Sequence, residues 1–302
     1  MKSSYLAHGK VILIGEHSVV YGYDALAMPI NSLHIKTTVE PAPEMWMDTE
    51  RYQGPFFMAP NEYNGLKYVV KKMLELAAST EQLKISYTGQ IPIERGLGSS
   101  ATVALATTRA MDDYFKLNLT EEQILAITNH AEMINHGKAS GLDAATVNSN
   151  YLVFFNQKDG PRVLKAKLGA TLLIMDTGEL GSTKEAVMQV HDQIKASPQA
   201  ADKLKRLGKL ADRTKTSWLN HDADQIGTYF NEAQEILCSF GLSTAKIDQL
   251  QKIALAHQAL GFKLSGSGLG GIVIALCKNH AVAQAIADHS QKIAVNSWIE
   301  EI

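Results

Sequence analysis

The sequence is poor in cysteine, in net charge and in long hydrophobic runs, and each shortage excludes a class of protein. With only Cys238 and Cys277, the 302-residue chain cannot form a disulfide framework or a cysteine-rich metal cluster. A net charge of -2 gives no basis for binding nucleic acid or a membrane surface. The apolar runs have the length of strands and fall well short of the roughly 18 residues that indicate a membrane span.

These shortages favour an ordinary globular protein. The N-terminus lacks the apolar segment of a secretion signal, so we expect a cytoplasmic protein whose two thiols are buried and reduced. A chain of 302 residues, 45% of them hydrophobic, suits one large or two ordinary domains. Because the pattern changes near residues 165–168, we expect an N-terminal domain over 1–166 and a C-terminal domain over 167–302.

The stretch Pro92–Ala101, Pro-Ile-Glu-Arg-Gly-Leu-Gly-Ser-Ser-Ala, joins a predicted strand over residues 83–88 to a predicted helix. Gly96 and Gly98 permit a tight turn and the close approach of a ligand. The first N–H groups of the helix would point at that ligand, with the positive end of the helix dipole behind them. This arrangement predicts an anion site, most economically a phosphate site. The alternative is a glycine-rich turn in which Ser99 caps the helix.

Two familiar phosphate loops do not fit this stretch. The Walker pattern needs a Lys-Ser/Thr pair after its last glycine, and none follows Gly98. The dinucleotide fingerprint G-x-G-x-x-A does fit, but it also needs an acidic residue about 20 positions on, at the end of a second strand. The acidic pair Asp112-Asp113 falls inside the helical pattern instead. The loop is therefore predicted to be a phosphate cradle of another kind.

Polar groups cluster in the first forty residues, where we expect several short strands in residues 4–40. Lys10 precedes an apolar strand, and Glu16 and His17 lie in the turn that follows it. Taken singly, they are explained as a solvated strand end, a turn carboxylate and a half-buried imidazole. Taken together beside two glycines they indicate a site, because functional groups concentrate on loops held by rigid elements.

Two carboxylates follow further along the chain. Residues 120–123 form a capping box that opens a helix, and this helix is expected to stop at Gly137. Glu132 lies near its C-terminal end, where a carboxylate either is solvated or meets a cation. Asp143 lies in a turn of small residues over 138–145, where a ligand could approach; the alternative is a local cap.

A second glycine-rich loop, Lys263–Gly271, lies between two predicted strands. It is interpreted as a backbone wall against a ligand, with a mobile turn as the alternative. Two such loops, a lysine and two carboxylates are what phosphoryl transfer needs, since that reaction depends on positioning and on stabilising the phosphates. Mg²⁺ takes one or two protein oxygens in such sites, and Ser100 and Glu132 could supply them.

Three segments together resemble the three motifs of the GHMP small-molecule kinase superfamily, in the same order: Lys10–Gly22, Pro92–Ala101 and Lys263–Gly271. The first has the form typical of mevalonate kinases, in which Gly-Glu-His is followed by Ser-Val-Val-Tyr-Gly. The resemblance implies a two-domain α+β fold, with an N-terminal domain like the second domain of ribosomal protein S5 and a ferredoxin-like C-terminal domain. It also implies ATP and Mg²⁺ as cofactors, mevalonate phosphorylated at its 5-hydroxyl, and neither nucleic acid nor membrane as partner. A homodimer is left open.

The resemblance further implies residue roles. Asp143 would be the catalytic aspartate and Lys10 its partner, while Ser100 and Glu132 would hold Mg²⁺. The site would be completed by residues of the ATP-phosphate loop, Pro92, Gly96, Leu97, Gly98, Ser99, Ser100 and Ala101, and by residues near mevalonate, Glu16, His17, Thr183 and Gly268.

The sequence departs from the family pattern at two places. Ala139 stands where proline is frequent, and residues 265–268 read Ser-Gly-Ser-Gly rather than Thr-Gly-Ala-Gly. Both changes concern backbone geometry. The remaining alternatives are a GHMP kinase for phosphomevalonate, a sugar or homoserine, a mevalonate-diphosphate decarboxylase, and a non-catalytic nucleotide-binding relative. The last alternative is disfavoured because a protein that only binds nucleotide needs the two glycine-rich loops but not the full set of polar residues, which is Lys10, Ser100, Glu132 and Asp143.

Overall fold

Two long strands occupy the region where several short ones were expected. They are β1 (Ser3–Ile14) and β2 (Ala25–Pro41), which pair with each other. The first six residues of β2 are all buried, and exposure alternates along much of the rest. Pro29, a residue type that usually marks a strand end, lies between the part of β2 that pairs with β6 (Leu152–Asn156) and the part that pairs with β5 (Leu83–Gly89). The prediction of several short strands is therefore wrong.

The computed structural model describes residues 2–92, 95–137 and 139–302. Ile93 and Glu94 of the first glycine-rich stretch and Lys138 of the turn before Asp143 lie outside the described residues. The chain forms two compact units that are not contiguous in sequence. Unit 1 comprises Met1–Lys10, Pro29–Ile93 and Gly98–Asn150, and unit 2 comprises Val11–Met28, Glu94–Leu97 and Tyr151–Ile302. The division of the sequence at residue 166 stays a prediction.

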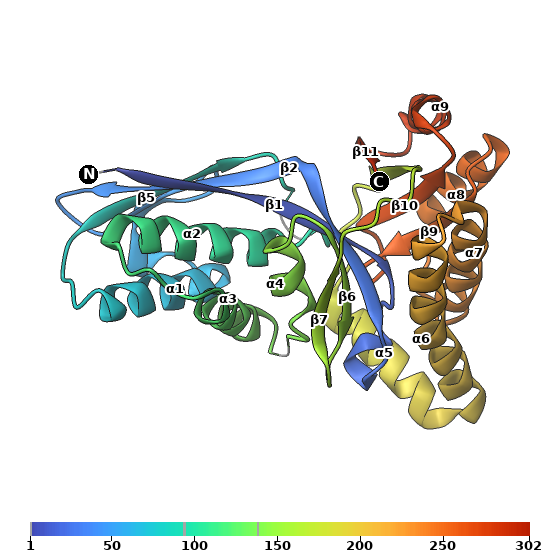
Figure 1. Ribbon diagram of the computed structural model, residues 1–302, viewed down its shortest axis with the longest axis horizontal. Coiled ribbons are helices and arrows are strands. Elements are labelled where there is room, and N and C mark those ends of the chain that lie inside the picture. The colour runs from blue at the N-terminus through green and yellow to red at the C-terminus, as the bar shows by residue number, and fades with distance from the viewer. Residues whose placement is uncertain (1, 93–94, 138) are drawn as a thin grey trace. The chain divides into compact units, whose positions relative to one another are not determined.

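In unit 1, three helices pack against one another and lie along one side of the strands (Figure 1): α1 (Asn64–Leu76), α2 (Ser99–Phe115) and α3 (Glu121–His136). The predicted capping box opens α3, since Thr120 accepts from the backbone N–H of Gln123 and Gln123 accepts in return from that of Thr120. The helix ends before Gly137, as predicted. The other elements are β3 (Trp46–Asp48), β4 (Gln53–Pro55), α4 (Leu142–Val147) and the 3-10 helices η2 (Phe56–Met58) and η3 (Asn61–Tyr63).

In unit 2, the main sheet has four antiparallel strands in the order β11-β8-β10-β9. Helices connect β8 to β9 and β10 to β11, whereas a loop joins β9 to β10; this β-α-β-β-α-β arrangement confirms the expected ferredoxin-like topology. All six residues of the central strand β8 are buried. The strands are β8 (Thr171–Asp176), β9 (Gly261–Ser265), β10 (Ile272–Cys277) and β11 (Asn296–Glu301).

The helices of unit 2 pack against this sheet and one another. Helix α7 packs on β9, and α9 packs on β8, β10 and β11. Strand β6 pairs with β7 (Gly160–Leu164) as an antiparallel hairpin. The helices are α5 (Thr183–Ala196), α6 (Pro198–Leu219), α7 (Ala223–Ser239), α8 (Ala245–Ala256), α9 (His280–Ser290) and the 3-10 helix η1 (Val19–Tyr21).

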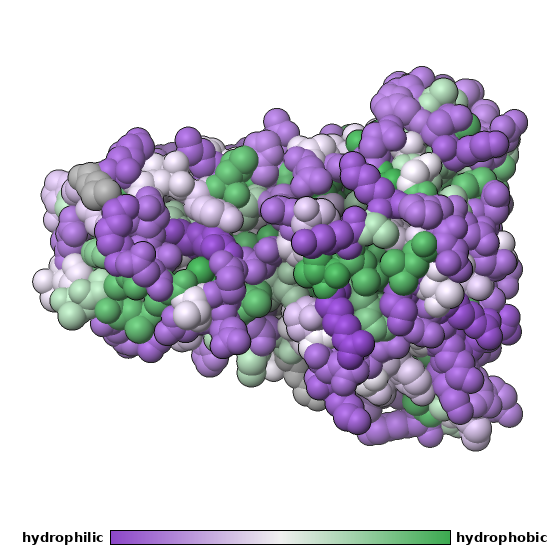
Figure 2. Space-filling view, viewed as in Figure 1, coloured by the Kyte–Doolittle hydropathy of each residue, from purple (hydrophilic) through white to green (hydrophobic). Residues whose placement is uncertain are grey.

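Figure 2 shows a face covered mainly by hydrophilic residues, with hydrophobic residues in small groups. Among the described residues, none of the helices is both long and apolar enough to cross a bilayer.

Candidate active site

The structure brings Lys10 and Asp143 together within unit 1. The Nζ atom of Lys10 lies 2.9 Å from Oδ1 of Asp143. The lysine side chain is only 3% exposed, whereas that of Asp143 is 37% exposed. Strand β1 supplies the lysine, and the first turn of the short helix α4 supplies the aspartate. The pair therefore presents one accessible carboxylate that a buried ammonium group holds in place.

A second polar group in unit 1 joins α2 to α3. Ser100 donates to Oε1 of Glu132 at 2.5 Å, and Asn135 donates to Oγ of Ser100 at 2.8 Å. Glu132 is 4% exposed, so it is not the solvated carboxylate that was one of the two alternatives from the sequence. Asn135 was not predicted; its position three residues after Glu132 on one helix was the available signal.

The charge of Glu132 is disfavoured where it stands. Burial, and next the negative charge of Asp143, raise its pKa to about 7, while the bond from Ser100 and the charge of Lys10 act in the opposite direction. A nearby divalent cation would favour the ionised carboxylate. One or two oxygen ligands, such as a hydroxyl and a carboxylate, are what Mg²⁺ takes from a protein in a phosphate site. Ser100 and Glu132 therefore fit a Mg²⁺ ion.

The N-terminus of α2 fits an anion. The helix has 17 residues and begins at Ser99, with Gly98 as the preceding N-cap residue, so Ser99 is not the cap. No side-chain hydrogen bond caps this end among the described residues. The first N–H groups of such a helix lack partners inside the helix and attract negative charge. These N–H groups are therefore available to a phosphate.

Gly98 serves a purpose that the sequence did not reveal. Its φ of +72° is a left-handed conformation, and a Cβ atom there would lie 2.7 Å from Cγ of Lys10. The missing side chain thus makes room for the lysine stem. By contrast, a Cβ on Gly96, whose φ is +84°, would lie 3.6 Å from the carbonyl oxygen of Ser265, which is an ordinary contact.

The other predicted residues of this loop differ in exposure. Leu97 and Ala101 are fully buried, and Ala101 belongs to a hydrophobic cluster with Ala7 and Leu105. Only the backbone of these two residues can therefore serve a phosphate. Pro92 is half-buried after strand β5.

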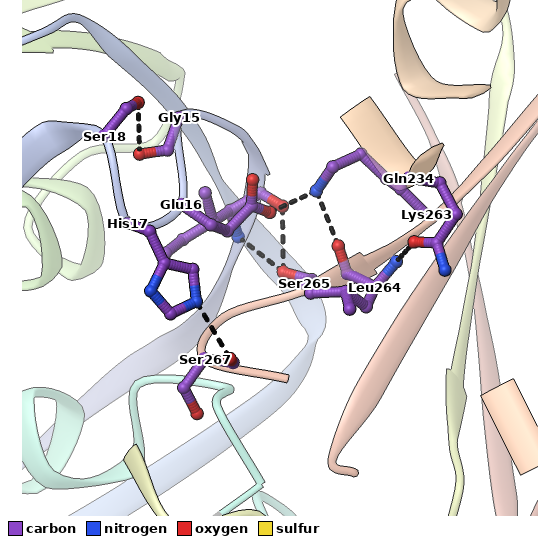
Figure 3. Close-up of polar contacts among 10 residues, drawn as sticks. Gly15, Glu16, His17, Ser18, Gln234, Lys263, Leu264, Ser265 and Ser267 are labelled. Atoms are coloured by element: carbon purple, nitrogen blue, oxygen red, sulfur yellow. Dashed lines mark hydrogen bonds and ion pairs between the residues drawn. The ribbon is translucent and has the colours of Figure 1, made fainter. Parts of the chain in front are cut away.

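Unit 2 holds a second polar cluster around Glu16 and Lys263 (Figure 3). The Nζ atom of Lys263 contacts Oε1 of Glu16 and donates to the carbonyl oxygen of Leu264 at 2.6 Å, and both charged side chains are fully buried. Burial lowers the pKa of Lys263, and the carboxylate of Glu16 opposes that shift. Gln234 of α7 accepts from the N–H of Leu264 at 2.8 Å. The pair ties the turn after β1 to strand β9.

The turn at residues 15–18 is held in an unusual conformation. His17 has a φ of 60°, which is rare for a residue with a side chain. Its Nε2 lies 2.9 Å from the carbonyl oxygen of Ser267, which can only accept, so Nε2 carries the proton (Figure 3). Burial, and the charge of Lys263, lower the pKa of His17, although the bond to Ser267 raises it. His17 is therefore a neutral imidazole whose Nδ1 can accept a hydrogen bond.

The remaining predicted residues of unit 2 lie against the same loop. Thr183, the first residue of α5, donates to Oγ of Ser267 at 3.3 Å. Gly268 has a φ of +81°, and a Cβ atom there would lie 2.9 Å from the backbone oxygen of Leu242. Its missing side chain thus accommodates Leu242.

Sequence profiles and known structures show which proteins this chain resembles. Residues 64–149 match the GHMP kinases N terminal domain, and residues 201–292 match the GHMP kinases C terminal domain. A mevalonate kinase of Pyrococcus furiosus is 30% identical and covers 95% of this chain and 93% of its own. The chain belongs to the GHMP kinase family.

Two solved structures extend the likeness. The mevalonate kinase from methicillin-resistant Staphylococcus aureus is 33% identical, with a TM-score of 0.78 over 99% of this chain and 98% of its own. That of L. major, solved in complex with R-mevalonate, has a TM-score of 0.82 at 23% identity over 98% of this chain and 94% of its own, which shows likeness of fold alone. Membership of the GHMP kinases implies that the chain uses ATP.

Proposed function

We propose that this GHMP kinase transfers the γ-phosphoryl group of ATP to the 5-hydroxyl of (R)-mevalonate. The observation that carries the proposal is the contact between the buried ammonium of Lys10 and the accessible carboxylate of Asp143. The mevalonate kinases from P. furiosus and S. aureus, at 30% and 33% identity over nearly the whole chain, support the choice of acceptor.

Asp143 and Lys10 act at the attacking oxygen. The carboxylate of Asp143 accepts the hydrogen bond of the acceptor hydroxyl and takes its proton as the new O–P bond forms and the bond to ADP breaks. The ammonium of Lys10 orients the carboxylate and offsets negative charge near the attacking oxygen. Proton transfer contributes on the order of 10²–10⁴-fold, so positioning and charge stabilisation supply most of the rate enhancement.

Ser100 and Glu132 would hold Mg²⁺. When bound, the ion neutralises charge on the β- and γ-phosphates. The proposal is supported by the 2.5 Å contact between the two side chains and by the raised pKa of the buried carboxylate. The uncapped N-terminus of α2 and the backbone of residues 96–101 would bind the phosphates.

At the acceptor end, we assign Glu16, His17, Thr183 and Gly268 to the surroundings of mevalonate. His17 offers a hydrogen-bond acceptor at Nδ1, which suits a hydroxyl group better than a phosphate. The free thiols of the two cysteines suit a reducing compartment, and we propose a cytoplasmic enzyme.

The test is ADP release by the purified protein with Mg-ATP and four acceptors: mevalonate, phosphomevalonate, galactose and homoserine. We expect turnover with mevalonate alone. Turnover with another acceptor would keep the phosphate machinery and reject the assignment of Glu16 and His17. Binding of ATP with no turnover of any acceptor would reject catalysis in favour of a nucleotide-binding role.

A further inference from the structure

A buried acidic turn follows β8, and it contacts both glycine-rich loops. Asp176 is 1% exposed and accepts from the N–H of Gly178 at 2.8 Å. In the loop after β9, the N–H of Gly271 donates to the carbonyl oxygen of Glu179 at 2.9 Å, and the N–H of Thr177 donates back to Gly271 at 3.0 Å. The turn over residues 176–179 is therefore fixed to the start of β10.

Arg95, from the first glycine-rich stretch, reaches this turn with its side chain. Its Nε lies 3.5 Å from Oδ2 of Asp176, and its Nη1 donates to the carbonyl oxygen of Glu179 at 2.8 Å. The Arg95 side chain is 19% exposed, so water screens these contacts only in part. A planar fork with several donors can make both contacts at once.

The backbone of the same stretch packs against the second loop. A Cβ atom on Gly271 would lie 3.1 Å from the carbonyl oxygen of Arg95, and one on Gly266 would lie 3.9 Å from Cα of Gly96. The two loops thus meet backbone to backbone inside unit 2, and glycines make that approach feasible. Residues 95–97 have contacts on both sides: the second loop through their backbone, and the acidic turn through Arg95.

We infer that Arg95 is a positioning residue for ATP, which fixes the phosphate loop by fastening residues 95–97 to the acidic turn at Asp176 and Glu179. This inference rests on the proposed ATP-phosphate loop and not on the identity of the acceptor. Arg95 acts through the loop backbone: with its guanidinium engaged by Asp176 and Glu179, the N–H groups of the loop are held in place before ATP arrives. Preorganisation of this kind raises affinity by reducing the ordering cost of binding.

The test is the dissociation constant for Mg-ATP, measured by calorimetry without any acceptor. Loss of a charge-assisted contact should raise it about tenfold in Arg95→Ala. Arg95→Lys can keep one of the two contacts and should lie between that variant and the wild type. Arg162→Ala removes the same charge from the exposed β6–β7 hairpin, where Arg162 lies 3.3 Å from Asp159, and should bind ATP like the wild type.

Asp176→Asn distinguishes positioning from direct contact with ATP. Its amide oxygen still accepts from Gly178, but the ion pair with Arg95 is lost. We expect weaker ATP binding in this variant, and no further weakening in the double variant Arg95→Ala/Asp176→Asn than in Arg95→Ala. Unchanged binding in Asp176→Asn, or additive losses in the double variant, would overturn the inference. Because no acceptor is present, neither result depends on whether mevalonate is the substrate.

Discussion

The substitution Gly98→Ala tests whether the first glycine-rich loop controls the position of Lys10, the proposed catalytic lysine. Gly98 has a φ of +72°, and the new Cβ would lie 2.7 Å from Cγ and 3.0 Å from Cε of Lys10. Lys10 is 3% exposed and cannot move into solvent without losing Asp143. We therefore expect the lysine stem to be displaced and its ammonium group to shift.

The expected loss in the free energy of unfolding has two parts. A left-handed conformation costs an L-residue roughly 1–2 kcal/mol, and overpacking a buried site typically costs about 1–3 kcal/mol more. The sum, about 2–5 kcal/mol, is within the stability of an ordinary domain, so the variant should fold. Misplacing a catalytic group by about 1 Å can lower the rate about 10²-fold, and we expect kcat to fall by that order.

Two control variants separate the two parts. Gly160→Ala in the β6–β7 hairpin has a φ of +76° and no atom within 4 Å, so it should show the backbone cost alone with kcat unchanged. Gly96→Ala has a φ of +84° and only an ordinary contact of its Cβ with the carbonyl oxygen of Ser265, so it should weaken ATP binding and spare Lys10. Chemical unfolding and steady-state kinetics measure these effects. If Gly98→Ala matched Gly160→Ala in both stability and kcat, the contact with Lys10 would not constrain catalysis.

Three further predictions concern the other polar groups. Lys263→Met removes the cation from the buried carboxylate of Glu16 and should cost about 3–5 kcal/mol in urea unfolding, whereas Lys263→Met with Glu16→Gln should recover most of that loss; equal losses would refute the buried-pair argument. Because the pKa of His17 is lowered on folding, its neutral form stabilises the protein above about pH 6.5, and that stability is lost as pH falls through the folded pKa. His17→Gln should thus flatten the acid side of a plot of Tm against pH, and an unchanged slope would contradict this. Ser100→Ala should raise the Mg²⁺ concentration for half-maximal activity roughly tenfold, because the ion loses one oxygen ligand whose contribution is comparable to that of a hydrogen bond to a charged group. An unchanged Mg²⁺ dependence would exclude Ser100 as a ligand.

Local sequence patterns were sufficient to predict the elements whose formation depends on residues close together in the chain. The capping box at Thr120 and the stop at Gly137 depend on residues within one turn, and both are where the sequence indicates. The buried strand β8 carries a continuous apolar run. The long strand β2 was missed because a proline within a strand normally signals its end, and only the arrangement of its two partner strands explains Pro29.

The candidate site was predictable as a set of residues but not as a set of contacts. Resemblance to family motifs named Lys10 and Asp143, which are 133 positions apart and which only the folded chain brings within 2.9 Å. Two of the glycines assigned to a ligand also make room for protein atoms, Gly98 for Lys10 and Gly268 for Leu242. Such close approaches involve residues far apart in sequence, and no local pattern encodes them.

The most direct test of the proposed chemistry is ADP release in the presence and absence of mevalonate, compared between the wild type and Asp143→Ala. We predict mevalonate-dependent ADP release by the wild type and its loss in the variant, which should still bind Mg-ATP. Equal mevalonate-dependent turnover by both proteins would show that the carboxylate beside Lys10 does not act at the attacking hydroxyl.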